Sequence, residues 1–233
     1  LLFAAEFFLV AQALRFTSAA HTVVLLYTAP IFVALGLHWK LPSERLSLIQ
    51  WLGIACAFFG IVIAFLFRPA ASQAAASSAL WGDALALLAG VLWAATTIAV
   101  RLTKLAEAPA TQTLFYQLFI AFFVLLPVAF FMGQATIHWS VLSLTSLLFH
   151  TVVVSFASYL IWFWLLKKYL ASQLGVFSFL TPIFGMCFGV VLLNEHLELN
   201  FLVGTCFVLM GVMVVSLHHK IKQYAQAFKV ALQ

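Results

Sequence analysis

Residues 13–46 read ALRFTSAAHTVVLLYTAPIFVALGLHWKLPSERL, and residues 165–197 read LLKKYLASQLGVFSFLTPIFGMCFGVVLLNEHL. The two stretches align along their length, and the shared pattern continues through a pair of glycines beyond each of them. The matched positions are Pro30–Phe32 with Pro182–Phe184, Glu44 with Glu195, Leu46 with Leu197, Gly53 with Gly204, and Gly60 with Gly211. Self-similarity of this kind indicates an internal repeat, so the chain holds two copies of one unit.

The composition of the chain is that of a membrane protein and excludes a soluble domain. Hydrophobic residues make up 66% of its 233 residues and charged residues 7%, and the mean hydropathy is +1.16. Soluble domains carry about 25% charged residues, which they need to cover a water-facing surface. In a bilayer, each crossing instead needs about 20 apolar residues that satisfy their own backbone hydrogen bonds as a helix. We therefore expect an all-α, polytopic membrane protein.

Eight apolar runs follow one another along the chain, separated by short polar connectors. They cover residues 1–14, 20–39, 46–67, 80–100, 111–131, 141–166, 171–193 and 201–217. The last seven are long enough to cross a bilayer as helices, whereas the first is shorter. The longest connector, RPAASQAAASSA at residues 68–79, is rich in alanine and serine, and we expect it to be a linker that divides the chain in two.

The distribution of basic residues predicts how the helices are oriented, because short cytoplasmic loops collect lysine and arginine. If the runs cross alternately, one side of the membrane receives nine basic residues and the other only Arg15 and Arg68. The nine are Lys40, Arg45, Arg101, Lys104, Lys167, Lys168, Lys220, Lys222 and Lys229. The side with nine is the expected cytoplasmic side, so we expect a multi-pass protein of the inner or plasma membrane with a cytoplasmic C-terminus.

The repeat predicts two parts of opposite orientation. The second copy, residues 80–218, has five runs, and the first, residues 1–67, has the last three of the same five. A unit with an odd number of helices inserts its two copies in opposite directions, and such inverted repeats are typical of secondary transporters. Beyond them, residues 219–233 carry apolar and basic residues at helical spacing. We expect this tail to lie on the cytoplasmic membrane surface as an amphipathic helix.

In motifs and spacing the chain resembles the EamA-type members of the drug/metabolite transporter superfamily. The resemblance rests on RFTSA, TAPIF and SERLSLIQWLGI in the first copy, on TPIF, NEHL and LVG in the second, and on GDALALLAGVLWA in the fourth run. It covers essentially the whole chain. It implies a ten-helix fold of two inverted five-helix repeats, of which about eight helices (3 + 5) are present and the first two missing. It also implies an exporter of amino acids, other small metabolites or toxic compounds.

Two prolines, Pro30 and Pro182, fall near the middle of matched runs. A proline removes one backbone hydrogen bond and kinks a helix. Kinks at matched positions near the midplane can serve as hinges in an alternating-access mechanism, and we expect this role for both prolines. Passive bending, which neighbouring helices tolerate in a membrane, is the alternative.

Glu6 is the one carboxylate deep within an apolar run. It precedes Arg15 by nine residues, which places it ~13 Å into a hydrocarbon core of ~30 Å. An acid at this depth should face the interior of the helix bundle. We expect it to line the substrate cavity, either as a proton-coupling group or as a contact for a substrate amine. A carboxyl group hydrogen-bonded to a neighbouring helix is the structural alternative.

Small polar and aromatic residues mark the rest of the expected cavity wall. The sixth run carries, at steps of three and four residues, Ser155, Ser158, Tyr159 and Trp162. Such a stripe suits an amphipathic small molecule, although close helix packing would also use it. Beside the matched prolines and in the fourth run lie Tyr27, Ser178, Thr181, Trp93 and Thr96. We expect both groups in the substrate cavity.

Three further polar residues are expected to have ordinary roles. His21 lies near the outer interface, where a solvated histidine is the usual arrangement. Asp83, at the outer end of its run, would interact with the N-terminal dipole of its helix. Glu195, like its counterpart Glu44, would cap a loop.

The leading functional hypothesis is a secondary carrier that moves a small neutral or zwitterionic, partly apolar metabolite outward by alternating access. No enzyme is expected, because neither an HExxH helix nor a serine elbow is present. A channel is not expected either, because the sequence contains no run typical of a selectivity filter. A non-transporting structural membrane subunit remains the alternative, and a membrane-embedded enzyme is a weaker one.

The expected partners are the small-molecule substrate and the lipid bilayer, with protons as a candidate coupling ion and the oligomeric state left open. The basic residues are spread thinly at the ends of apolar runs, which argues against nucleic acid. The three cysteines, Cys56, Cys187 and Cys206, each lie inside an apolar run, where a thiol behaves as a small hydrophobe. We therefore expect no disulfide, no metal site and no cofactor.

Overall fold

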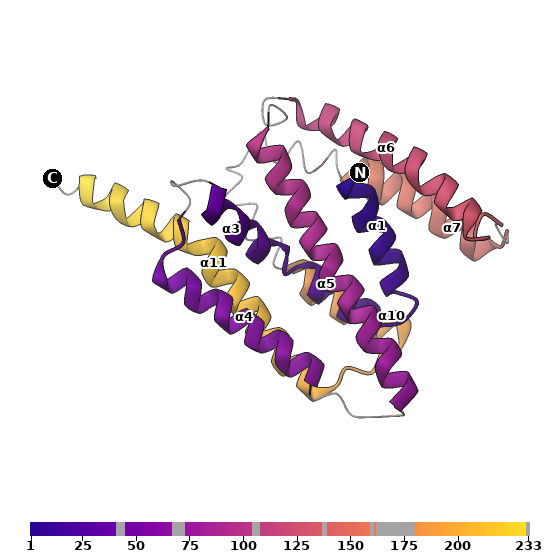
Figure 1. Cartoon of the computed structure of the whole chain (residues 1–233), viewed down its shortest axis with the longest axis horizontal. Coiled ribbons are helices and arrows are strands. Elements are labelled where there is room, and N and C mark those ends of the chain that lie inside the picture. The colour runs from indigo at the N-terminus through magenta and orange to yellow at the C-terminus, as the bar shows by residue number, and fades with distance from the viewer. Residues whose placement is uncertain are drawn as a thin grey trace. The chain divides into compact units, whose positions relative to one another are not determined.

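The computed structural model describes residues 1–40, 45–66, 73–103, 108–136, 139–158, 161 and 180–231, and the regular structure in these residues is helical (Figure 1). The helices are α1 (Leu2–Ala13), α2 (Ala19–Leu26), α3 (Ala29–Lys40), α4 (Leu48–Leu66), α5 (Gln73–Leu102), α6 (Ala110–Phe131), α7 (Val141–Leu148), the π-helix η3 (Phe149–Ser158), α10 (Leu180–Leu193) and α11 (Leu199–Ala231).

Among the described residues, four helical stretches are long and apolar enough to cross a membrane: Ala19–Lys40, Ser77–Val100, Thr111–Phe131 and Val141–Ser158. Shorter apolar helices cover Leu2–Ala13, Leu48–Ala64, Leu180–Leu193 and Leu199–Val215. No strand occurs among the residues that the structure describes. These features confirm the expected class, an all-helical, polytopic membrane protein.

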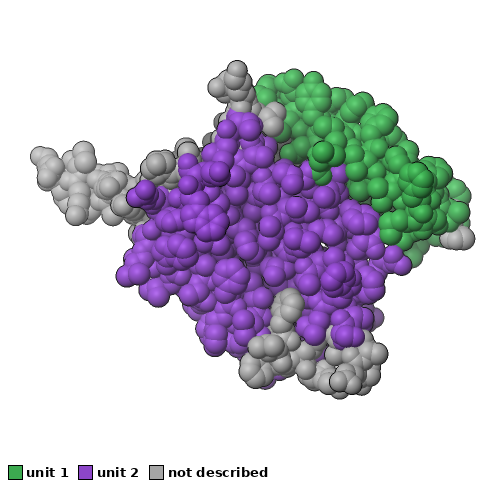
Figure 2. All heavy atoms as spheres, in the orientation of Figure 1, with its two compact units in different colours: residues 1, 108–178 green, residues 2–107, 179–233 purple. Residues whose placement is uncertain are grey.

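The chain forms two compact units, coloured separately in Figure 2. Unit 1 comprises residue 1 and residues 108–178, and unit 2 comprises residues 2–107 and 179–233. Unit 2 therefore joins a segment from near the start of the chain to one from its end.

In unit 2, α5 is the helix against which α1, α2 and α3 pack. Its buried face is built from small residues, Ala86, Ala89, Gly90 and Ala94. At Gly90 an added Cβ would lie 3.0 Å from the Leu26 carbonyl oxygen, so any larger residue would push the two backbones apart by a few tenths of an ångström. Small residues of this kind are how membrane helices pack, because lipid offers them no hydrophobic driving force for association.

The second close contact in unit 2 joins α4 to α11 through two pairs of glycines. A Cβ at Gly53 would lie 3.1 Å from the Gly211 carbonyl oxygen, and a Cβ at Gly204 would lie 2.5 Å from that of Gly60. Because residue 53 meets residue 211 while residue 60 meets residue 204, the two helices are antiparallel. Gln50 extends the contact by donating a hydrogen bond to the Val215 carbonyl at 3.1 Å.

Unit 1 contains α6, α7 and η3. The start of α7 is held by a reciprocal capping box between Ser140 and Ser143. From Phe149 onward the helix winds more widely, as η3, with hydrogen bonds to the fifth residue along the chain. Positions 155 and 158 are therefore further apart around the helix axis than they would be in an α-helix.

Three helix boundaries differ from those expected. Residues 73–79, expected to be part of a linker, are helical and begin α5, because alanine is the strongest helix former; residues 67–72 lie outside the described residues. The tail up to Ala231 is helical but continues α11, since no glycine or proline interrupts the chain after Gly211. The second apolar run, expected as one helix, is divided into α2 and α3.

Candidate functional site

The division between α2 and α3 occurs just before Pro30. The missing amide of Pro30 leaves the carbonyl of Leu26, four residues earlier, without its helical donor, and this carbonyl faces Gly90 of α5. Thr28, fully buried, closes the break by donating its hydroxyl to the Leu25 carbonyl at 2.6 Å. Pro30 itself is the second residue of α3, where its lack of a donor costs little.

The break places Tyr27 against Trp93 of α5. Their ring centroids are 5.2 Å apart with an interplanar angle of 80°, an edge-to-face arrangement that aromatic rings favour. Both rings are partly exposed. Two of the expected cavity residues, 66 positions apart in the sequence, thus meet at an interrupted helix. Thr96, one turn further along α5, donates its hydroxyl to the Leu92 carbonyl at 3.0 Å.

Glu6 is buried in α1, with 7% of its surface exposed. Its Oε2 atom has no hydrogen-bond partner within the part of the chain that the structure describes. Glu6 precedes Ala13, the last residue of α1, by seven residues, or ~10 Å along the helix. The carboxylate therefore belongs to an inner turn of α1 rather than to its C-terminal end.

The other expected site residues that the structure describes lie in α10 and η3. Thr181 is exposed and Pro182 buried, both in the first turn of α10. Ser158 of η3 donates its hydroxyl to the Val154 carbonyl, and Ser155 lies in the same helix. The positions outside the described residues are Tyr159, Trp162 and Ser178.

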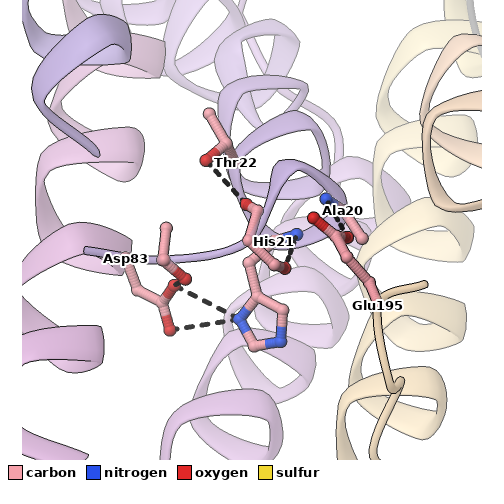
Figure 3. A network of polar contacts seen from close by, with 7 residues as sticks. Ala20, His21, Thr22, Asp83 and Glu195 are labelled. Carbon is pink, nitrogen blue, oxygen red and sulfur yellow. Dashed lines mark hydrogen bonds and ion pairs between the residues drawn. The ribbon is translucent and has the colours of Figure 1, made fainter. Parts of the chain in front are cut away.

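A network of side chains surrounds the N-terminal end of α2 (Figure 3). The Nδ1 atom of His21 lies 3.2 Å from each carboxylate oxygen of Asp83 on α5, and the two side chains are 6% and 1% exposed. Thr17 donates its hydroxyl to the same carboxylate. The His21 ring stacks on Phe201 of α11, with centroids 3.7 Å apart.

Glu195, in the connection between α10 and α11, binds the same end of α2. Its two carboxylate oxygens accept hydrogen bonds from the backbone amides of Ala19, at 2.7 Å, and Ala20, at 3.0 Å. The next amide, that of His21, donates to the Ser18 hydroxyl at 3.1 Å. The first-turn amides of a helix have no partner within the helix and attract anions, so the glutamate completes the cap of α2.

We refer to Thr17, His21, Asp83 and Glu195 as the α2 polar cluster. The expectations for three of its members were wrong or incomplete. His21 is buried and paired rather than solvated. Asp83 is the eleventh residue of α5, too far from its N-terminus to act on the helix dipole. Glu195 caps a helix distant in the sequence rather than its own loop.

The sequence signal that could have identified the cluster is the rarity of ionisable residues in these segments. Pairing across helices was hidden because His21 and Asp83 are 62 positions apart, and Ala19 and Glu195 are 176 apart. Only 7% of the residues are charged, so each ionisable residue within these segments is unusual. A buried ionisable group needs a polar partner, because burial without one is costly.

The arrangement of the α2 polar cluster is unlike a hydrolytic centre. Nucleophilic catalysis needs a hydroxyl bonded to the imidazole that removes its proton. Here the Thr17 hydroxyl donates to Asp83. No group of three or more metal-ligating side chains occurs in the described part of the chain. The cluster is built to join helices: residues from the α1–α2 turn, α2, α5 and the α10–α11 connection meet there.

Comparison with known proteins identifies relatives over most of the chain. The model of the EamA-like transporter family matches residues 1–66 and 80–217. The chain is 26% identical over 200 residues to the uncharacterized transporter YoaV of Bacillus subtilis, covering 85% of this chain and 67% of that protein. An uncharacterized transporter of Archaeoglobus fulgidus is 25% identical, covering 88% of this chain and 69% of that one.

A third relative carries a more specific name. The probable amino-acid metabolite efflux pump of Salmonella typhimurium is 26% identical over 227 residues, covering 92% of this chain and 73% of the pump. The chain thus spans about two thirds to three quarters of the length of these three relatives. No solved structure matches the chain.

Proposed function

Because the chain belongs to the EamA-like transporter family, we propose that it works as a secondary carrier that moves small metabolites across a membrane by alternating access. The chain is a multi-pass membrane protein, and its relatives are named transporters, which points to a transporter rather than an enzyme. The observation that carries the proposal is the helix interrupted beside Pro30, with Tyr27 and Trp93 meeting at the break. Substrate sites of secondary transporters are commonly built on interrupted helices.

The proposed architecture is a pair of inverted repeats, comprising residues 1–67 and 80–218. The glycine contacts between α4 and α11 support it. In the sequence repeat, Gly53 corresponds to Gly204 and Gly60 to Gly211. A two-fold axis relating the copies turns the contact between residues 53 and 211 into one between residues 204 and 60, and both contacts are present.

The proposed substrate cavity takes in the residues expected from the sequence: Glu6, Tyr27, Trp93, Thr96, Ser155, Ser158, Tyr159, Trp162, Ser178 and Thr181, with Pro30 and Pro182 as hinges. The edge-to-face ring pair supports a partly apolar substrate, since aromatic walls with a few polar groups suit amphipathic small molecules. The buried Glu6 carboxylate, with an unpartnered oxygen, supports contact with a substrate amine or a coupling proton.

The proposed direction is export from the cytoplasm across the plasma membrane. The excess of basic residues on the side of the C-terminus supports a cytoplasmic tail. Amino acids are the first substrate class to test, because one relative is named a probable amino-acid metabolite efflux pump.

The test is counterflow in proteoliposomes that contain the full-length protein. Vesicles loaded with one unlabelled amino acid are diluted into the same labelled compound, for a panel of amino acids, with and without a pH gradient. A carrier gives saturable uptake that is accelerated by substrate on the far side. Absence of flux for every amino acid would remove this substrate class, and absence for a broader metabolite panel would favour the non-transporting membrane subunit.

A further inference from the structure

We propose that the α2 polar cluster is a gate. In this structure its hydrogen bonds hold the N-terminal end of α2 against α5 and the α10–α11 connection. In each transport cycle they break, α2 swings away, and one mouth of the substrate path opens. The inference rests on the proposed carrier function and adds to it the element that moves and the bonds that hold it.

The end of α2 is held from three directions. Asp83 binds His21 from α5, Glu195 binds the Ala19 and Ala20 amides from the α10–α11 connection, and Phe201 stacks on the His21 ring from α11. Figure 3 shows Asp83 on one side of this helix end and Glu195 on the other. The contacts are concentrated in the first turn of α2, at one end of the helix bundle.

The bonds of the cluster are of a kind that can be exchanged for water. A hydrogen bond between two protein groups contributes only modestly to net stability, because water replaces the partner when the bond breaks. The cluster also lies where the chain turns at the end of the bundle, beside the exposed residues Arg15 and Asn194. Water can therefore reach the groups once they separate.

The α2 helix is built to move as a unit. It has eight residues, begins after the turn at Arg15–Ser18, and ends at the break before Pro30. Rotation at the break would carry the end of α2 without displacing α3. Further along, α2 meets α10 at Gly185, where an added Cβ would lie 3.2 Å from Val23 Cβ. This contact is apolar, so the cluster supplies the polar bonds that hold the helix end.

A permanent staple between helices is the competing explanation of the same geometry. It predicts that α2 and α10 never separate, and that weakening the cluster lowers stability without opening a path. Two experiments separate the gate from the staple. One fixes α2 to α10 and leaves the cluster intact, and the other weakens the cluster and leaves α2 free.

The first experiment is a reversible disulfide between Val23→Cys and Gly185→Cys. Their Cβ separation is within a few tenths of an ångström of that in natural disulfides. The background carries alanine at the three native cysteine positions, Cys56, Cys187 and Cys206. The gate predicts that oxidation stops counterflow in proteoliposomes and that dithiothreitol restores it. Each single-cysteine variant, treated identically, is the control.

The second experiment measures opening without any transport. Val24, 2% exposed and one turn beyond His21, is replaced by cysteine in the same background, and its reaction rate with a membrane-impermeant maleimide is followed. Loss of a hydrogen bond to a charged group typically shifts an equilibrium about tenfold. Asp83→Asn and His21→Gln should therefore raise the rate by about tenfold. His196→Gln, an exposed histidine of the α10–α11 connection, should leave it unchanged.

Either of two outcomes would overturn the gate: full counterflow by the oxidised double-cysteine protein, or an unchanged labelling rate in correctly folded cluster variants. If Asp83→Asn does not fold, His21→Gln and the disulfide still decide the question. If the unmodified protein transports nothing, the labelling experiment alone tests the opening of α2. Failure of the carrier function is thereby distinguished from failure of the gate.

Discussion

At the scale of the residue, the carboxylate of Glu6 is a buried acidic group, and burial of such a group is costly. Placing an ionised acid at the centre of a membrane helix costs about 2.5–3.5 kcal/mol on insertion scales. Glu6 is buried, and one of its oxygens has no partner among the described residues. A polar group held in this state is available to a ligand. By contrast, the hydroxyl of Thr96 is already satisfied within its own helix.

We predict that Glu6→Gln selectively weakens transport of substrates that carry an amine. The amide has the size of the carboxylate but lacks its charge, so it loses the charge-assisted hydrogen bond. The KM for amine-bearing substrates in counterflow should rise by about tenfold or more, with little change for analogues that lack the amine. Thr97→Val, which removes an exposed hydroxyl of α5, is the matched control. An equal change in KM for the amine-bearing substrates and for the analogues that lack the amine would mean that Glu6 acts only through the structure of the protein.

At the scale of the element, small residues decide which helices can touch. The helices α4 and α11 approach until glycine carbonyls lie where side chains would otherwise be. Interfaces in lipid depend on such close packing because burial of apolar surface supplies no driving force there. The same logic explains why α5, with its face of alanine and glycine, can be contacted by three other helices.

We predict that Gly60→Val destabilises unit 2 by about 1–3 kcal/mol, the usual cost of overpacking. A Cβ at this position would lie 2.8 Å from the Phe207 Cβ and closer still to the Gly204 carbonyl, a backbone group that cannot rotate away. The measurement is the midpoint of unfolding by sodium dodecyl sulfate, followed by circular dichroism. Ala55→Val, on the exposed face of α4, should shift the midpoint far less. Equal shifts would show that α4 and α11 do not pack in this way.

At the scale of the whole molecule, the orientation of the chain follows from the proposed alternation of its spans. Three apolar runs separate Gln134 from Gln223. We therefore predict that cysteines at these two positions react from opposite sides of the membrane, Gln134→Cys from outside and Gln223→Cys only after permeabilisation. The measurement uses an impermeant maleimide on intact cells, with the native cysteines replaced. Labelling of both cysteines from the same side would contradict the number of spans between them. Labelling of Gln223→Cys from outside, and of Gln134→Cys only after permeabilisation, would show the opposite orientation.

The candidate site was partly predictable from the sequence. The repeat drew attention to Pro30 and to Tyr27 beside it, and the composition of the fourth run drew attention to Trp93. The pairing of the two rings was not predicted, because their distance depends on how α2 and α5 pack. A kink at Pro30 was predicted, but the division of the run into α2 and α3 was not, since hydrophobicity continues through the break.

The sequence by itself determined the solvent, the helical class and most of the span limits, because backbone satisfaction in lipid and the length of an apolar run are local properties. It also predicted an internal repeat. Only the tertiary structure decided that His21 meets Asp83, that Glu195 caps α2, and that four glycines join α4 to α11. In lipid, a helix face that packs and one that meets lipid are both apolar, so hydrophobicity cannot indicate which residues become neighbours.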